Sequence, residues 1–453
     1  MKYKELNSAK EIKDILETLG GVLAVDTEYT ELNVRKAELI SVAISNGFEA
    51  YSIPARLVKH LKFLEKKPLL LFQNFGVDVF MLRKNGIDLF NTPFWDTMLM
   101  HHLIDENGEH GLDAMVKRYF NDNYKEIFWQ AYKSIEEAPK EERIEYECKD
   151  AYYTARLAHL FLGMLRDRMP LVEHVHQLAL SLVETEWRGI RVDVPLLKNT
   201  KETMYAEIQD YLPKLREDFR QHVSLWELDT WNEEMAKRKT LKGKQGVKRP
   251  EFNFASDTQV KWLLYEALKL PVIEKTKKGA PSTSYETIET LSKEHPELAN
   301  LVVYKGAKTL YSTFVEGLLD RVEQDRIYPR FNVNGTVTGR LGHSNPNMGN
   351  LPKEGIIRTF FLPDPGNNII GADFSQLEVV VEANLTEDKQ LLKIILEGAS
   401  KHDITAHGLG IPRSLAKTVN FALQYGAGVH KLSKILNCSM KEAQHQFNKY
   451  WEV

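Results

Sequence analysis

The sequence has little cysteine and no long hydrophobic segment. Its two cysteines, Cys148 and Cys438, lie far apart, which fits neither a disulfide framework nor a cysteine metal site. No stretch approaches the roughly 20 apolar residues that a membrane span requires. The N-terminal segment mixes charges with isolated apolar residues, unlike a secretory signal. We therefore expect a protein of the reducing cytoplasm that makes no contact with a membrane.

The chain also lacks an excess of charge of one sign. Its 60 Lys and Arg residues nearly balance 63 Asp and Glu residues, and the formal net charge is -3. A molecule whose whole surface bound a polyanion would be basic, so any contact with nucleic acid must be local. Repeats and low-complexity tracts are absent too. The length of 453 residues predicts two or more globular domains.

Short apolar runs alternate with helical patterns at the start of the chain. The runs GVLAVD, ELISVAIS and KPLLLFQN are each bounded by polar or turn-prone residues. This alternation predicts an α/β domain whose strands are covered by helices. From about residue 100 the pattern becomes mainly helical, and residues 158–169 are expected to form a connecting helix into a second region.

Two carboxylates follow the first apolar run. Asp26 and Glu28 lie two residues apart in LAVDTEYT, so in a strand their side chains project to the same face. One face with two carboxylates can hold a divalent cation. An isolated Asp-x-Glu pair is a weak signal and is often solvated surface, but acids at the end of a core strand stand where open α/β sheets usually place their sites.

Two further polar pairs have the spacing of one helical turn. Asn74 and Asp78 lie four apart, as do Tyr146 and Asp150. The ordinary explanation of Asn74 is a helix cap. That of Tyr146 and Asp150 is a packing or ion pair on a helix surface.

Together the three pairs resemble the three motifs of the DEDD family of 3′→5′ exonucleases, in its tyrosine-bearing subgroup. The segments FWDTMLMHHL and GLDAMVKRYF are similar to the helical connectors of that family. The resemblance implies a ribonuclease H-like domain that cleaves phosphodiesters with two Mg²⁺ or Mn²⁺ ions about 4 Å apart. The implied metal ligands are Asp26, Glu28, Asp78 and Asp150; Tyr146 is the implied water-orienting residue, and Asn74 an implied DNA contact.

A second candidate site lies near the end of the chain. In RSLAKTVNFALQYG, the residues Arg413, Lys417, Phe421 and Tyr425 recur every four positions, so they share one broad face of a predicted helix. Two cations and two aromatic rings on one face could bind a triphosphate and stack a base. The alternative is an amphipathic helix whose aromatic side chains enter a core.

This helix, completed by Gly426, resembles motif B of family A DNA polymerases, the bacterial DNA polymerase I type. Upstream, ADFSQLE resembles motif A. The resemblance implies that Asp373 binds both metal ions of a polymerase site and that Phe374 offers its backbone carbonyl. It also implies that Glu378 lies beneath the incoming sugar and excludes a 2′-hydroxyl.

TGRLGHSNPNMGNLP, in a stretch (331–352) too rich in Gly, Asn and Pro for a long helix, resembles the template-primer segment of the same family. Arg340 and Asn350 are the implied DNA contacts, whereas Gly349 stands where many members have Gln. The run at 237–250 contains seven Lys or Arg and no acid. We expect either a solvated loop or a contact with the duplex backbone there.

The resemblance covers nearly the whole chain and suggests its domain organisation. Residues 1–165 are expected to form the exonuclease domain and residues 166–453 an incomplete right-hand polymerase domain. Within the latter, the thumb would span about 195–310, the palm 311–385 and the fingers 386–453. Residues 367–385 are expected to form a buried strand, a turn and a helix.

One motif of family A polymerases has no counterpart here. This His-Asp-Glu motif normally lies well beyond motif B and carries the second metal-bridging aspartate of the palm. We therefore expect that this polypeptide alone does not polymerise efficiently and that a separate C-terminal polymerase fragment is a possible partner. No 5′ nuclease domain is recognisable either, which favours a phage-like replicative enzyme.

The sequence thus predicts a DNA-directed DNA polymerase with a proofreading exonuclease. Its expected partners are a DNA primer-template and dNTPs, in the cytoplasm of a bacterial or phage-infected cell. The alternatives are an exonuclease only, or a non-catalytic primer-template binding protein. The exonuclease is expected to prefer single-stranded 3′ ends, because terminal bases must leave the duplex to reach a buried cleft.

Overall fold

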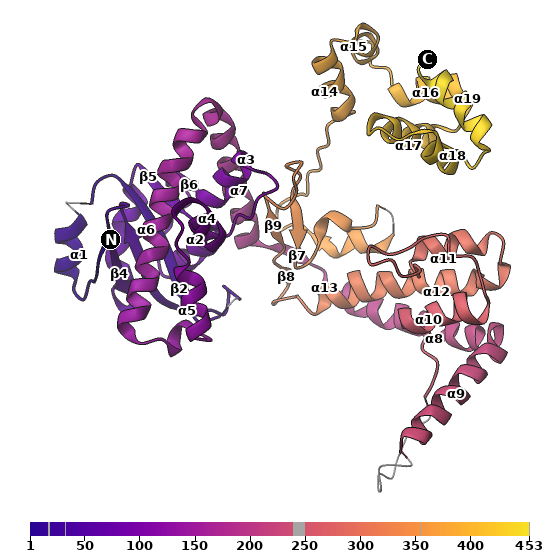
Figure 1. The fold of residues 1–453 in the computed structure, drawn as a ribbon, viewed down its shortest axis with the longest axis horizontal. Helices are drawn as coiled ribbons and strands as arrows, with labels where there is room; N and C mark the ends of the chain where they lie inside the picture. Colours follow the sequence, from indigo (N-terminus) through magenta and orange to yellow (C-terminus); the bar gives the residue numbers. More distant parts are fainter. Residues whose placement is uncertain (17–18, 32, 239–249, 354, 453) are drawn as a thin grey trace. The chain divides into compact units, whose positions relative to one another are not determined.

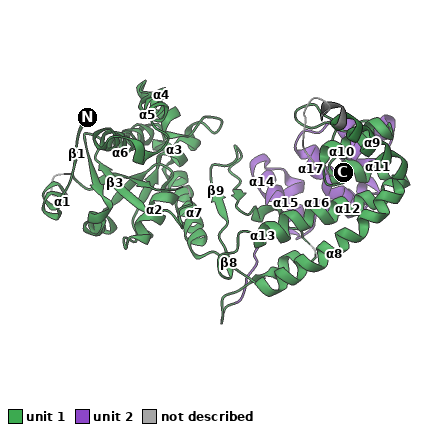
Figure 2. Ribbon diagram, turned by 90° about the horizontal axis from the view of Figure 1, so that it is seen from below, with its two compact units in different colours: residues 1–367 green, residues 368–453 purple. Residues whose placement is uncertain are grey.

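A computed structural model describes residues 1–16, 19–31, 33–238, 250–353 and 355–452. The chain divides into two compact units, Met1–Asn367 and Asn368–Val453, which Figure 2 shows in different colours. The position near residue 165 that the sequence suggests as a domain boundary lies inside the first unit. There, helix α6 (Lys140–Met164) ends and helix α7 (Met169–Arg188) begins after one 3-10 turn.

A mixed six-stranded sheet lies at the centre of the N-terminal region (Figure 1), in the order β1-β4-β3-β2-β5-β6. Its strands are β1 (Lys2–Glu5), β2 (Val22–Tyr29), β3 (Leu39–Ser45), β4 (Glu49–Pro54), β5 (Leu69–Phe72) and β6 (Phe94–Asp96). Strands β2, β3 and β4 are antiparallel, whereas β1, β5 and β6 pair in parallel with their neighbours. The three apolar runs form β2, β3 and β5, and the predicted α/β class is confirmed.

Helices pack on both faces of this sheet. The helices of this region are α1 (Ala9–Leu16), α2 (Phe75–Lys84), α3 (Thr97–Ile104), α4 (Leu112–Phe120), α5 (Tyr124–Ala131) and the long α6 and α7; of these, α4 and α5 pack on α6. On one face the core includes Leu23 and Val25 of β2 with side chains of α2. On the other, Ala24 packs with Ala155 and Ala158 of α6. These small side chains allow α6 to approach the sheet closely, because the distance between packed elements depends on the side chains at the contact.

Helices dominate the next region, as the sequence predicts for residues 195–310. They are α8 (Val194–Asp218), α9 (Arg220–Arg238), α10 (Asp257–Trp262), α11 (Tyr285–Ser292), α12 (Ala299–Leu310) and α13 (Gly317–Leu319). The core shared by α8 to α12 contains Phe252, Phe254 and Tyr304, whereas Leu318 of α13 packs in a separate cluster. Of the basic run at 237–250, residues 239–249 lie outside the described residues.

Two small sheets complete the first unit. One contains β7 (Ile190–Val192), β8 (Arg326–Ile327) and β11 (Phe361–Leu362) in the order β11-β7-β8; the other is the hairpin of β9 (Arg330–Asn332) and β10 (Gly342–Ser344). The Gly-, Asn- and Pro-rich stretch at 331–352 contributes to this hairpin and to a 3-10 turn at Met348–Asn350. It contains no long helix, as predicted.

The second unit is helical. It contains α14 (Leu377–Thr386), α15 (Lys389–Leu396), α16 (Lys401–Leu409), α17 (Arg413–Gln424), α18 (Val429–Leu436) and α19 (Met440–Tyr450). Leu409, Val419, Leu423 and Leu432 form its core.

The prediction of a buried strand just before α14 is wrong. Residues 367–374 form no strand, and the side chains of Ile370 and Phe374 are 89% and 78% exposed. A buried strand needs hydrogen-bonded neighbours on both sides. Among the described residues no strand pairs with this segment.

We found no helix in the described part of the chain with the length and apolar composition needed to cross a membrane.

Candidate active sites

Strand β2 places Asp26 and Glu28 on one face of the sheet, as predicted. Side chains alternate along a strand, so both lie on the face of Ala24, which packs against α6. From α6, Tyr146 and Asp150 are presented one helical turn apart, and they are 5% and 4% exposed. The structure thus brings β2 and α6, far apart in sequence, to one buried site.

Three carboxylates meet at this site. Asp26, Glu28 and Asp150 each offer an oxygen atom, and these three oxygens all lie within 4.8 Å of one another. Carboxylate oxygens are the ligands that Mg²⁺ and Mn²⁺ prefer. The donor set therefore fits a divalent metal ion.

Asp78 approaches from the opposite face of the sheet. Thr27 projects away from Asp26 and Glu28, and its backbone N and its Oγ1 both donate hydrogen bonds to Asp78 Oδ1 at 2.8 Å. Helix α2, which carries Asp78, packs on this face. Asp78 is therefore held beside the three clustered carboxylates rather than among them.

Asn74 occupies the N-cap position of α2, in a left-handed conformation with φ 64°, but its side chain makes no capping hydrogen bond. The buried backbone N–H of Phe75, in the first turn of α2, donates instead to Asp96 Oδ2 at 2.7 Å. Asp96 also accepts from Met98 N at 2.8 Å, so one buried carboxylate caps both α2 and α3. Sequence reasoning missed Asp96, although it lies within the connector FWDTMLMHHL.

The clustered acids have perturbed pKa values. Burial, together with the charges of Asp150 and Glu28, raises the pKa of Asp26 well above its ordinary range. Burial and Asp150 do the same for the pKa of Glu28. Burial raises the pKa of Asp78 to about 8, although its hydrogen bonds from Thr27 lower it. Carboxylates this close are not all ionised unless cations balance them.

Helix α5 supplies contacts that sequence reasoning missed. Lys125 Nζ forms an ion pair with Asp150 Oδ2 and donates to the Tyr146 phenol oxygen at 3.0 Å. The hydroxyl of Tyr124 donates to Asp150 Oδ1. Burial alone would lower the pKa of Lys125, but the charge of Asp150 raises it well above its ordinary value. No spacing in YKEIFWQA distinguishes these residues from an ordinary amphipathic helix.

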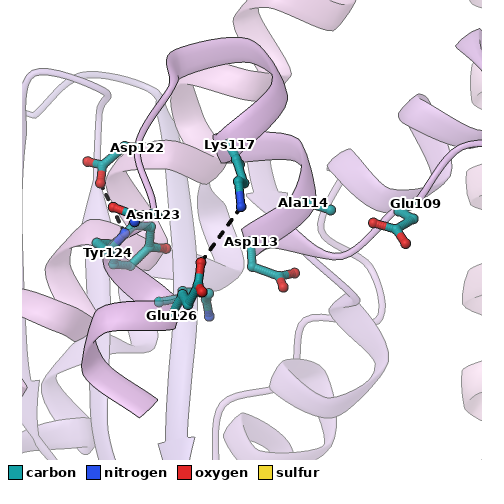
Figure 3. A pocket seen from close by; sticks show the side chains of 9 residues that line it. Glu109, Asp113, Ala114, Lys117, Asp122, Asn123, Tyr124 and Glu126 are labelled. Carbon is teal, nitrogen blue, oxygen red and sulfur yellow. Dashed lines mark hydrogen bonds and ion pairs between the residues drawn. The ribbon is translucent and has the colours of Figure 1, made fainter. Parts of the chain in front are cut away.

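A pocket of 220 Å³ lies between α4 and α5, beside this site (Figure 3). Tyr124 and Lys125 line it, together with acidic side chains such as Asp113 and Glu126. Lys117 of α4 pairs with Glu126 across it at 3.7 Å. Most of the charged groups in this lining are acidic, so the pocket is poorly suited to a phosphate.

The second candidate site lies in the second unit. The predicted helix is α17, and Tyr425 follows its last turn. The hydroxyl of Tyr425 donates to Glu378 Oε1 of α14 at 3.1 Å, so the structure joins the segments that resemble motifs A and B. Phe421 is half-buried against His402, with ring centroids 5.6 Å apart, whereas the Tyr425 side chain is 69% exposed. Phe421 and Tyr425 are therefore not both buried in a hydrophobic core.

The two cations of α17 are exposed. Arg413 Nε donates to Asp403 at 2.7 Å, and Lys417 Nζ lies 5.9 Å from the ring centroid of Phe421. Asp373 and Phe374 lie in the exposed segment before α14. The group of clustered carboxylates among the described residues does not include Asp373.

The proposed template-primer residues lie in the first unit. Arg340 precedes β10, and its backbone carbonyl accepts a hydrogen bond from Thr336 at 2.8 Å. Asn350 ends the 3-10 turn that follows β10, and both side chains are exposed. A Cβ atom at Gly349 would lie 2.9 Å from the His343 ring, so a larger residue there would require His343 to move.

Comparison with known proteins gives matches along nearly the entire chain. A family model described as 3′-5′ exonuclease matches residues 3–166, and one described as DNA polymerase family A matches residues 226–453. The DNA polymerase I of Borreliella burgdorferi is 28% identical, over all of this chain and 50% of that protein. That of Bacillus subtilis is 29% identical, over 83% of this chain and 42% of that protein. The chain thus spans about half the length of these relatives, or less.

A solved structure has the same fold. It is the POL domain of Pol1 from M. smegmatis, in complex with DNA primer-template and dNTP. The TM-score is 0.78 at 21% identity, over 99% of this chain and 76% of that one. The resemblance inferred from the motifs is confirmed. Because the polymerase model matches half of its residues, this chain belongs to DNA polymerase family A.

Proposed function

We propose that residues 1–165 form a domain that removes nucleotides from DNA 3′ ends with two divalent metal ions. The observation that carries this proposal is the convergence of Asp26, Glu28 and Asp150 within 4.8 Å, next to the buried Tyr146. The match of residues 3–166 to an exonuclease family model supports it.

The proposed chemistry is hydrolysis of the terminal phosphodiester. Asp26, Glu28, Asp78 and Asp150 would hold the ions, Asn74 would contact the DNA, and Tyr146 would orient the attacking water. Mg²⁺ or Mn²⁺, when bound, would stabilise the charge that develops on the leaving 3′ oxygen. The carboxylates of the chain contribute by fixing these positions, and Thr27 contributes by holding Asp78.

The test is degradation of a 5′-labelled single strand with and without Mg²⁺. The wild type is expected to shorten the strand from its 3′ end, and Asp26→Ala to lose this activity. Asp167→Ala, which removes an exposed carboxylate outside the site, serves as the charge-matched control and should retain it. If the wild type bound the strand without shortening it, the runner-up of a non-catalytic primer-template binding protein would be favoured instead.

We also propose that the remaining residues carry part of a DNA polymerase that acts in replication, with the exonuclease as its proofreading site. The hydrogen bond between Tyr425 and Glu378 supports this, because it joins the nucleotide-binding helix to the segment with Asp373. The incoming dNTP would contact Arg413 and Lys417. The primer-template would contact Arg340 and Asn350, and the reaction would take place in the cytoplasm. The thumb, palm and fingers would follow the ranges suggested by the sequence.

The alternative of an exonuclease only is tested by primer extension with the Asp26→Ala form, in which degradation is suppressed, mixed with a separate fragment that carries the His-Asp-Glu motif of a family A polymerase. Extension that Asp373→Asn abolishes would establish a polymerase. If Asp373→Asn left extension unchanged, the assignment of Asp373 would be wrong.

A further inference from the structure

The phenol oxygen of Tyr146 receives two hydrogen bonds from helix α5. Lys125 Nζ lies 3.0 Å from it, and Trp129 Nε1 lies 3.2 Å from it. Both partners can only donate: an ammonium group has no lone pair, and the indole N–H is a donor alone. A hydroxyl oxygen has two lone pairs, so both acceptor positions of Tyr146 are filled.

The ring of Tyr146 is also held in orientation. Phe128 stacks on it with ring centroids 4.1 Å apart and planes 24° apart, and Trp129 meets it edge-on at 5.8 Å. Lys125, Phe128 and Trp129 occupy positions i, i+3 and i+4 of α5, which share one face of a helix. That face packs on Tyr146, so one helix sets both the plane of the ring and the partners of its oxygen.

We infer that Lys125 and Trp129 are positioning residues that make Tyr146 a hydrogen-bond donor only. With both lone pairs occupied, the only hydrogen-bonding capacity left to the phenol is its O–H. This group can donate to a water molecule or a phosphate oxygen, but it cannot accept a hydrogen bond or a proton from water.

The inference rests on the proposed exonuclease function and specifies the role of Tyr146 in it. Hydrolysis forms a bond between the water oxygen and phosphorus and breaks the bond between phosphorus and the 3′ oxygen. The attacking water releases a proton, and the leaving oxygen takes one up from solvent. Tyr146 cannot accept the proton that the water releases. This proton therefore passes to a carboxylate of the site or to solvent. Tyr146 acts by aiming the water, not as its base.

Trp129 provides the sharper test, since Lys125 also pairs with Asp150. Trp129→Phe keeps a six-membered aromatic ring next to Tyr146 and removes the indole N–H together with the five-membered ring that carries it. Without that donor the phenol can rotate and accept, so kcat is expected to fall about fivefold with KM unchanged, the effect of one hydrogen bond. In a Tyr146→Phe background, Trp129→Phe should have no further effect, because the two residues act through the same oxygen. Trp451→Phe, in the second unit, is the matched control.

The result that would overturn the inference is an equal loss in both backgrounds, since Trp129 would then act on DNA or on folding. Lys125→Arg, which keeps a donor, should retain more activity than Lys125→Met, and equal losses for the two would also count against it.

A second measurement separates this inference from the proposed function. The ¹³Cζ resonance of Tyr146, identified by its disappearance in Tyr146→Phe, should shift in Trp129→Phe. An unchanged resonance would overturn the hydrogen-bond assignment. If the resonance shifted while the wild type degraded no 3′ end, the proposed function would fall and the donor arrangement would stand.

Discussion

Thr27 contributes to the carboxylate site although it is not one of the carboxylates. It lies between Asp26 and Glu28, yet its side chain faces the opposite side of β2 and holds Asp78 through two hydrogen bonds of 2.8 Å. A residue that hydrogen-bonds to a metal-binding side chain and fixes its orientation commonly affects metal binding nearly as much as that side chain itself. Thr27 is therefore the link between the two faces of the sheet.

Replacing Thr27 by Val should weaken this link without changing the shape of the core. The backbone N–H would still donate to Asp78, but the hydroxyl bond would be lost. We expect half-maximal exonuclease activity to require about tenfold more Mg²⁺, the usual effect of losing such a supporting contact. A Mg²⁺ titration of the degradation rate measures this. Thr309→Val on the exposed face of α12 is the control, and an unchanged Mg²⁺ requirement in Thr27→Val would contradict the prediction.

His101 of α3 gives the stability of the first unit a pH dependence. Its side chain is fully buried, and burial, followed by the positive potential of His110 and Arg118, lowers its pKa from 6.5 to about 4. Between these values the unfolded chain binds a proton that the folded chain does not. The contribution is therefore fully present above about pH 6.5 and is lost as the pH falls toward 4.

At about pH 5, His101 should cost about 2 kcal/mol of stability relative to neutral pH. Urea unfolding of the wild type and of His101→Phe at the two pH values measures this cost. The variant should lose less stability on acidification, by about that amount, because phenylalanine cannot be protonated. Identical acid sensitivity of the two proteins would show that other groups are responsible.

At the scale of elements, the contact between α6 and the sheet determines where Asp150 lies. Ala155 and Ala158 pack directly on Ala24 of β2, two residues before Asp26. Small side chains on both sides let the helix lie close enough for Asp150 to join Asp26 and Glu28. The carboxylate site therefore depends on side chains that take no part in its chemistry.

A larger side chain at this contact should separate the carboxylates. Ala155→Leu is expected to push α6 away from β2, to cost about 1 to 3 kcal/mol of stability, and to reduce exonuclease activity at least about tenfold. His159→Leu introduces the same residue at an exposed position of α6 and should leave activity unchanged. Thermal unfolding and the degradation assay, performed on both variants, measure the two effects. Full activity of Ala155→Leu would contradict this account of α6.

At the scale of the whole molecule, we expect the burial of the proposed exonuclease site to restrict the DNA that can reach it. Asp78, Tyr146 and Asp150 are each 5% exposed or less. We expect the last bases to separate from the duplex before the terminal phosphate reaches carboxylates buried to this degree, at a cost of about a few kcal/mol.

We therefore expect single-stranded 3′ ends to be degraded at least about tenfold faster than blunt duplex ends. The rates on a labelled strand, alone and annealed to its complement, measure the difference. A duplex with mismatched terminal bases should fall between the two. Equal rates on all three substrates would show that the terminus need not separate.

A second prediction at the scale of the whole molecule concerns primer extension. Two-metal nucleotidyl transfer requires at least two carboxylates, and the carboxylate cluster among the described residues does not include Asp373. A polypeptide of residues 1–453 is thus expected to shorten primers without extending them. Extension by this polypeptide, made in the Asp26→Ala form to suppress degradation, would contradict the prediction.

The sequence by itself determined which residues share a face of one strand or one helix, because that depends only on the spacing of residues along the chain. The two-residue repeat of β2 puts Asp26 and Glu28 on one face, and the four-residue spacings put Tyr146 with Asp150 and Arg413 with Lys417 on helix faces. These relations depend only on the backbone geometry of one element, so they could be predicted before any packing was known. The order of the motifs along the chain was enough for the family resemblance.

Only the tertiary structure decided which elements meet. The approach of Asp78 through Thr27 and the two donors on Tyr146 join residues from separate elements, and no spacing encodes such contacts. The same reason explains why the strand predicted at the start of 367–385 does not form. Its apolar pattern is that of a buried strand, but a strand exists only where neighbouring strands complete its hydrogen bonds, and among the described residues none lies beside it.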